Sequence, residues 1–359
     1  MSDGGREGRE LAIRSAPTAS GPTASGDGGA RDLAIRSASP AKGARRALEE
    51  AADALAKQSV AENTRRSYKS DWESWEAFCS AHGFAALPAD PEHVRLYLTQ
   101  LTQYAGRKGK PLTPKTAQRH LSAIAAAHRA EDIPFDTRHP VLRRLTDGIR
   151  RAFGVRQEGA PALRRDDIAA ICKTLGLDVR STRNKAIILL GFAGGFRRSE
   201  LVGLNVEDLD FGKDGLTVLL KRSKTDQEGK GRTVAIVPGA APPTCPVGAM
   251  KAWLRAAKIE DESDSALFRP VNRWGAVELN RLSDKAVDRI VKDACRAAGL
   301  KEIYSAHSLR AGHVTEALAS GADRAAIKRQ TGHASDAMLD RYAREADLFA
   351  NNSSERLGL

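Results

Sequence analysis

The hydrophobic pattern in the first part of the chain has the period of an α-helix. Aromatic side chains recur every three or four positions within 64–82, which predicts a helix with one buried face. Two more helices begin at start signals, because a proline follows Asp90 in one case and the capping residue Thr113 in the other. A further helix is expected over 140–153. The pattern therefore predicts an all-helical N-terminal domain, which we place at residues 45–153.

The second part of the chain combines helical patterns with two short strand-like runs. Residues 216–221 and 232–237 are rich in Val, Leu and Ile and flank a polar turn, which predicts a β-hairpin. The helices expected from the remaining apolar runs cover 163–175, 181–193, 245–257, 283–298, 308–320, 323–331 and 335–346. The fold class is therefore mainly α, with a small antiparallel sheet in a second domain at residues 163–359. A linker at 154–162 separates the two domains.

The first 44 residues differ in composition from the rest of the chain. They are rich in Gly, Ala, Ser, Thr and Pro, and large apolar side chains are scarce, so burial would not compensate for the entropy lost on ordering. A near-repeat, ELAIRSA at 10–16 and DLAIRSA at 32–38, lies within this segment. We expect a disordered tail over residues 1–44.

Charge and composition narrow the class of protein. The formal net charge of +12 favours a polyanionic partner such as nucleic acid. No run of about 18 apolar residues occurs, and no apolar stretch follows a basic segment at the start, so we expect a cytoplasmic protein without a membrane span. The four cysteines are scattered without a Cys-x-x-Cys pair, which favours buried free thiols over a metal site or a disulfide.

One interval of the N-terminal domain carries positive charge without any acidic residue. It lies between Glu92 and Glu131. An unopposed sign over nearly forty residues favours a surface that contacts DNA phosphates. The candidate DNA-binding residues in this interval are Arg107, Lys108, Lys110, Lys115 and Arg119.

The candidate chemistry lies in two clusters of the second domain. The first cluster is GFRRSEL, at residues 195–201. The second contains, at successive gaps of 3, 23 and 9 residues, His307, Arg310, His333 and Tyr342. Two guanidinium groups can bind the non-bridging oxygens of a phosphodiester, because arginine is planar and always charged. A tyrosine hydroxyl can attack phosphorus and form a covalent intermediate, so the set suits cleavage and rejoining of DNA without a metal.

Taken together, the motifs resemble those of the tyrosine recombinase (phage integrase) family. They are GFRRSEL at 195–201, a lysine in the predicted hairpin turn, HSLR at 307–310, GH at 332–333, and Tyr342. The resemblance covers about residues 58–359 and implies a helical, SAM-like core-binding domain before the catalytic domain, the two closing around double-stranded DNA. It further implies a 3′-phosphotyrosyl intermediate and strand exchange through a Holliday junction in a tetramer, with no cofactor and no metal.

The resemblance also assigns roles to the motif residues by position. Arg197 and Arg310 match the arginines that bind the scissile phosphate, and Glu200 matches the acidic residue that orients its neighbours. His307 and His333 match residues that stabilise the developing negative charge, with His333 as a hydrogen-bond donor to a phosphate oxygen.

The nucleophile and the general acid complete this assignment. Tyr342 matches the nucleophilic tyrosine. Lys224 matches the turn lysine that protonates the leaving 5′ oxygen, and it is favoured over its neighbours Lys221, Arg222 and Lys230.

Other tasks for the same residues remain open at this point. An enzyme of the same chemistry could be a type IB topoisomerase, or a resolvase of multimers or hairpin telomeres, and a third reading is a DNA-binding protein without catalysis. The sequence also leaves open whether accessory DNA-bending proteins take part. The segment after Tyr342 either docks on a neighbouring protomer or forms a frayed end.

Overall fold

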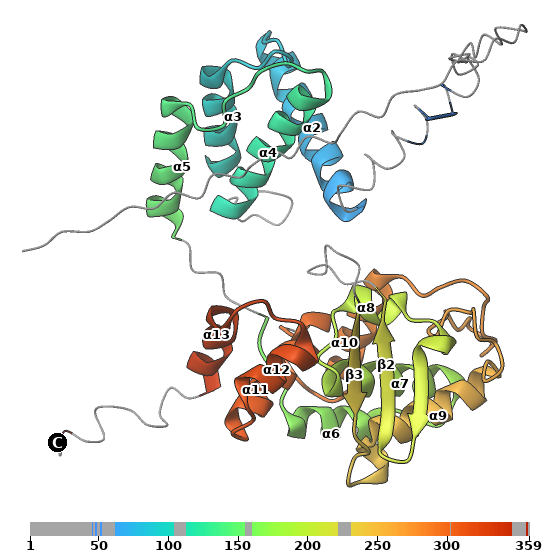
Figure 1. Cartoon of the computed structure of the whole chain (residues 1–359). Coiled ribbons are helices and arrows are strands. Elements are labelled where there is room, and N and C mark those ends of the chain that lie inside the picture. Colours follow the sequence, from blue (N-terminus) through green and yellow to red (C-terminus); the bar gives the residue numbers. More distant parts are fainter. Residues whose placement is uncertain are drawn as a thin grey trace, which may run out of the picture. The chain divides into compact units, whose positions relative to one another are not determined.

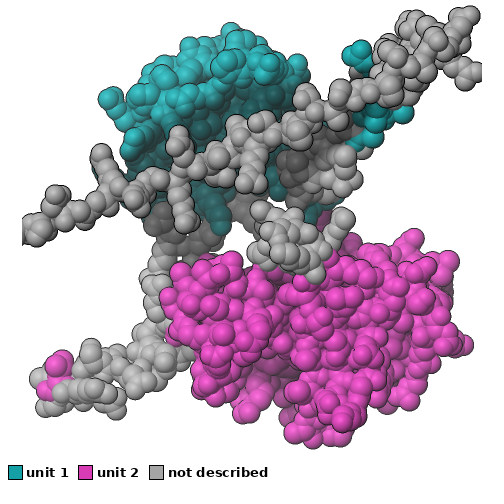
Figure 2. Space-filling model, in the orientation of Figure 1, with its two compact units in different colours: residues 1–155 teal, residues 156–359 magenta. Residues whose placement is uncertain are grey.

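The structure, a computed structural model, describes residues 62–103, 113–154, 160–221, 231–301 and 303–346, with a few single positions near the two ends (Figure 1). The chain divides into two compact units, Met1–Val155 and Arg156–Leu359, which Figure 2 colours separately. We call them the N-terminal unit and the C-terminal unit. The tail expected at 1–44 lies outside the described residues. None of the described helices is both long enough and apolar enough to cross a membrane.

The described part of the N-terminal unit consists of helices. They are α2 (Glu62–His82), α3 (Pro91–Gln103), α4 (Pro114–Ala130) and α5 (Pro140–Phe153). Thr113 caps α4 as expected, because its hydroxyl accepts a hydrogen bond of 3.3 Å from the backbone N–H of Thr116. Trp75 of α2 and Tyr97 of α3 are buried, and their ring centroids lie 5.2 Å apart. The predicted aromatic face of α2 thus packs into the core of this unit, which the other helices complete.

Helices also dominate the C-terminal unit, which confirms the mainly α prediction. They are α6 (Arg165–Thr174), α7 (Val179–Ala193), α8 (Arg198–Gly203), α9 (Pro246–Ala257), α10 (Asp284–Ala297), α11 (Ala306–Ala319), α12 (Arg324–Thr331) and α13 (Asp336–Ala346). The hydrophobic pattern does not predict α8, because six residues are too few to show a helical period.

A three-stranded antiparallel sheet completes this unit. The strands β1 (Leu209–Gly212), β2 (Gly215–Leu220) and β3 (Arg232–Ile236) follow one another in this order. The sequence predicts only β2 and β3. The strand β1 has just two inward positions, and its structure depends on pairing with β2, where Leu209 faces Val218. The buried side chains of β2 and β3 share one core with those of α7 and α9.

A second, smaller core lies where α11, α12 and α13 meet, at the end of the unit opposite α9 in Figure 1. Its buried members are Ala311, Val314, Ile327, Leu339 and Tyr342. Helix α11 begins at Ala306, two residues before the predicted start. The cause is Ser305, the N-cap, whose backbone N–H donates to the Ser308 hydroxyl at 3.0 Å. The earlier start places His307 in the first turn of α11.

Candidate active site

Arg197 lies at the N-cap of α8, two residues after the glycine pair that follows α7. Its backbone N–H donates to Glu200 Oε2 at 2.9 Å, and its Nη1 donates to Glu200 Oε1 at 2.6 Å. Among the described residues, its Nη2 makes one long contact of 3.4 Å, with the carbonyl oxygen of Gly332. One buried carboxylate therefore caps the helix and holds the guanidinium at the same time.

Arg310 is the most deeply buried cation of the site, with 1% of its surface exposed. Its Nη1 donates to the carbonyl oxygens of Gly195 at 2.7 Å and Thr331 at 2.6 Å, and its Nη2 lies 3.0 Å from His333 Nε2. Burial, and then repulsion from Arg197, lowers the pKa of Arg310 to about 10. The group is still a cation at neutral pH.

His333 is fixed in one tautomer by its two neighbours. An arginine has no acceptor, so Arg310 donates to Nε2, and the ring proton must lie on Nδ1. Nδ1 is 2.7 Å from the Thr331 hydroxyl, which in turn donates to the carbonyl oxygen of Ile327 at 2.6 Å. Burial and the nearby guanidinium groups lower the pKa of His333 to about 3, so the ring is neutral. In this arrangement Nε2 is an acceptor.

Tyr342 extends from α13 into the small core and is 6% exposed. Its hydroxyl lies 3.3 Å from His307 Nε2, and its ring centroid lies 6.0 Å from that of His333. The pKa of His307 is lowered, first by loss of hydration and then by the charges of Arg310, Arg341 and Arg197. A neutral imidazole is therefore in contact with the tyrosine hydroxyl.

Two contributors to this site are absent from the predicted set. Arg232, the first residue of β3, donates through Nη2 to Glu200 Oε2 at 3.1 Å and through Nη1 to the carbonyl oxygen of Gln330. Thr331 sets the tautomer of His333. Neither carries a sequence signal, because an arginine or threonine in isolation is most often a surface residue.

Of the predicted catalytic residues, the structure brings together those on α8, α11, α13 and the end of α12. They are Arg197, Glu200, His307, Arg310, His333 and Tyr342. Lys224 lies outside the described residues. Its neighbour Lys221 forms an ion pair with Asp208 at 2.9 Å.

The structure describes only two of the five predicted DNA-binding residues of the N-terminal unit. Arg107, Lys108 and Lys110 lie outside the described residues. Lys115 is exposed on α4. Arg119 donates through Nη2 to Asp71 Oδ1 at 2.9 Å and pairs through Nε with Oδ2 at 2.8 Å, yet 45% of its side chain is exposed.

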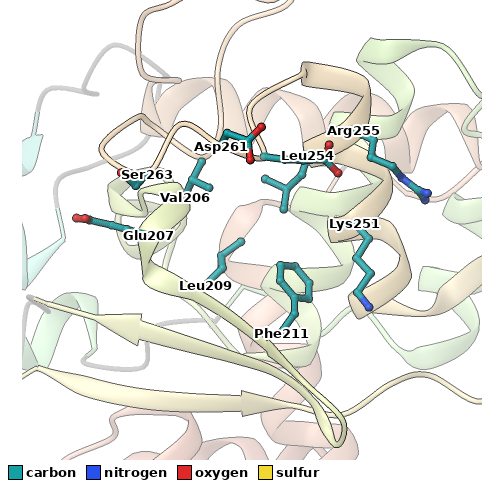
Figure 3. A pocket seen from close by; sticks show the side chains of 10 residues that line it. Val206, Glu207, Leu209, Phe211, Lys251, Leu254, Arg255, Asp261 and Ser263 are labelled. Atoms are coloured by element: carbon teal, nitrogen blue, oxygen red, sulfur yellow. The ribbon is translucent and has the colours of Figure 1, made fainter.

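A cavity of the C-terminal unit is separate from these residues. It has a volume of about 670 Å³ and lies between β1 and α9 (Figure 3). The side chains of Leu209, Phe211 and Leu254 line it, with charged groups such as Glu207 and Lys251 at its edge. None of the predicted catalytic residues that the structure describes lines this cavity.

The fold is similar to that of solved DNA-bound recombinases. The integrase of transposon Tn1549, in complex with transposon right end DNA, aligns with a TM-score of 0.57 and 18% identity over 84% of this chain and 95% of that chain. The XerH site-specific recombinase, bound to palindromic difH substrate, aligns with a TM-score of 0.54 and 18% identity over 76% of this chain and 73% of that chain. At these identities the likeness concerns the fold.

Sequence comparison identifies the family. Residues 161–348 match the family model described as the phage integrase family. The integrase/recombinase xerD homolog of Selenomonas ruminantium is 35% identical over 317 residues, which cover 86% of this chain and 89% of the relative. Tyrosine recombinase XerD of Mycobacterium leprae (strain TN) is 31% identical over 296 residues, covering 78% of this chain and 86% of the relative. The chain therefore belongs to the phage integrase family of tyrosine recombinases.

Proposed function

We propose that this chain is a site-specific DNA recombinase that cleaves and rejoins DNA strands through a 3′-phosphotyrosyl intermediate. The observation that carries the proposal is the position of Tyr342. Its hydroxyl contacts His307, and its ring lies beside His333, which is itself hydrogen-bonded to Arg310. A nucleophile on α13, a neutral imidazole and a buried cation on α11, and His333 just after α12 thus converge.

In the proposed cleavage step, the Tyr342 hydroxyl attacks phosphorus and loses its proton while the 5′ oxygen leaves. His307 Nε2 is in place to accept that proton, because its ring is neutral and 3.3 Å away. Lys224 is the proposed acid that protonates the leaving 5′ oxygen. The phosphotyrosyl bond conserves the energy of the broken bond, so rejoining requires only attack by a 5′ hydroxyl.

The guanidinium groups are proposed to stabilise the phosphate during this transfer. Arg310 has a fixed orientation, and Arg197 Nη2 has one long protein contact within the described part of the chain. Preorganised cations of this kind act on the non-bridging oxygens, where negative charge is concentrated. Glu200 is the supporting residue that holds Arg197 in place.

Double-stranded DNA is the proposed substrate, and a tetramer on DNA is the proposed assembly. The net charge of +12 supports a polyanionic partner. Among proteins of similar fold, a lambda integrase tetramer has been solved bound to a Holliday junction, with a TM-score of 0.51 and 16% identity. We assign residues 45–153 to core binding and 163–359 to catalysis, and expect the protein to act on the nucleoid in the cytoplasm.

The decisive experiment is adduct formation on a nicked suicide DNA substrate in the presence of EDTA. DNA flanking the encoding gene supplies candidate sites. Wild type should give a covalent protein–DNA band on a denaturing gel, and Tyr342→Phe should give none while binding DNA within about threefold of wild type. Tyr304→Phe, in the same unit, should keep the adduct. If wild type binds this DNA but forms no adduct, the protein is a DNA-binding protein without this chemistry.

A further inference from the structure

Arg232 occupies a position between three parts of the candidate active site. It is the first residue of β3, directly after the segment that contains Lys224. Only 16% of its side chain is exposed. Its Nη2 donates to Glu200 Oε2 at 3.1 Å, and its Nη1 donates to the carbonyl oxygens of Gln330 and, at 3.4 Å, Arg329. One guanidinium therefore joins the strand, the carboxylate and the end of α12.

The Arg232 side chain lies close to Gly332, the residue between α12 and His333. The glycine has a φ of +68°. A Cβ added there would lie 3.1 Å from Arg232 Nε and 3.3 Å from its Cζ. A larger residue would therefore be strained by its backbone and would press on the guanidinium. The close approach couples Arg232 to the loop that positions His333.

The electrostatic environment of Arg232 is unfavourable for a residue that serves only packing. Burial lowers its pKa, the Glu200 carboxylate raises it, and Arg197 lowers it further. Its Nε is buried without an acceptor among the described residues. Leaving a buried donor unpaired costs about 1–3 kcal/mol. An apolar side chain would avoid both the loss of hydration of a cation and the unpaired Nε donor. We therefore expect the guanidinium to have a role beyond packing.

We propose that Arg232 is a positioning residue for strand cleavage, an inference that rests on the proposed function. Through Glu200 it positions Arg197. Through the carbonyl oxygens at the end of α12 it positions the turn at Gly332 and His333. Both Nη atoms of Arg232 donate to protein acceptors, and its proposed action is through these groups. The planar fork of a guanidinium reaches both sides at once, whereas a lysine ammonium reaches only one.

The test measures single-turnover adduct formation on saturating suicide substrate, with DNA affinity and urea unfolding measured in parallel. Arg232→Met should slow adduct formation by about 10²-fold, because small displacements of catalytic groups have effects of this size. DNA affinity should stay within about threefold. Arg232→Lys should recover only part of the rate.

Arg183→Met is the matched control. Arg183 is also a buried arginine, 6% exposed, and it donates to the carbonyl oxygen of Arg269 at 3.1 Å near the other end of α7. Arg183→Met should lower the free energy of unfolding but leave the rate of adduct formation per folded molecule unchanged. If both variants lose the same rate per folded molecule, the role of Arg232 is structural and the inference is wrong.

A double-mutant cycle tests whether Arg232 acts through Glu200. In the Glu200→Gln background, adding Arg232→Met should slow adduct formation by less than it does in wild type, because one of the two routes is already broken. If the losses in the rate of adduct formation are fully additive, Arg232 does not act through Glu200. Failure of wild type itself to form an adduct would reject the proposed function, and the inference with it, whereas equal rates for wild type and Arg232→Met would reject the inference alone.

Discussion

Thr331→Val isolates the hydrogen bond that fixes the tautomer of His333. Thr331 is fully buried, and valine keeps nearly the same shape while removing the hydroxyl. The wild-type hydroxyl donates to the carbonyl oxygen of Ile327 and accepts from His333 Nδ1–H at 2.7 Å. Because Arg310 occupies Nε2, the proton cannot move to the other nitrogen without facing a second donor. The variant therefore leaves a buried N–H without an acceptor.

The size of the effect follows from comparison with a second threonine. Thr315 is 1% exposed, and its hydroxyl donates only to the carbonyl oxygen of Ala311, four residues earlier, at 2.8 Å. Thr315→Val should therefore cost about 1 kcal/mol, the typical net value of one such bond. Thr331→Val loses an equivalent bond and also strands the His333 donor, which adds about 1–3 kcal/mol.

Equilibrium urea unfolding of the two variants, at pH 7 and with comparable m-values, gives this difference directly. Adduct formation on the suicide substrate provides a second measure, which should fall for Thr331→Val and not for Thr315→Val. Equal destabilisation by the two substitutions would refute the tautomer assignment, since the extra cost depends on His333 alone.

Two further predictions concern the framework around the site. Gly312→Ala should destabilise the C-terminal unit by about 3 kcal/mol or more, because a Cβ there would lie 1.9 Å from the carbonyl oxygen of Leu163. Gly148→Ala, with nothing within 4 Å, should stabilise its helix by up to about 1 kcal/mol, and similar melting shifts for the two would contradict the reasoning. Stability should also fall as pH drops from 7.5 to 5, because burial lowers the pKa of His313 to about 4, below the usual 6.5, so the unfolded chain takes up the proton first. In urea unfolding, His313→Gln should remove about 1–2 kcal/mol of this pH dependence, and an unchanged slope would contradict the assignment.

The parts of the fold that could be predicted from sequence are those that depend on local interactions. Ser283 and Asp323 become N-caps whose side chains accept from the backbone at 3.2 and 2.9 Å, respectively. Such signals involve residues three apart and are readable in a single sequence. The sequence does not predict the strand β1 and the short helix α8, because neither is long enough to show a period and β1 depends on its partner strand.

In the candidate site, too, some residues can be predicted from sequence and others depend on tertiary contacts. The motif residues could be named in advance because the family resemblance carries their order and spacing. Arg232 and Thr331 could not be named, because their roles depend on contacts made only in the folded chain. Arg232 lies 98 residues from Gln330 in sequence, and the state of His333 depends on Arg310, 23 residues away. The donor role expected for His333 therefore requires that Nε2 change partner or gain a proton.

The charged side chains of the candidate active site carry an excess of positive charge. Arg197 and Arg232 pair with the Glu200 carboxylate, and Arg310 lies close enough to feel its charge, so among the described residues three cations share this one anion in a largely buried space. The neighbouring histidines are neutral and add no further charge. An arrangement with excess buried positive charge is unfavourable for the free protein, since each cation loses hydration without a full counter-charge. A phosphate group would supply the missing negative charge at this point, so the unfavourable term in folding becomes a favourable term in binding DNA.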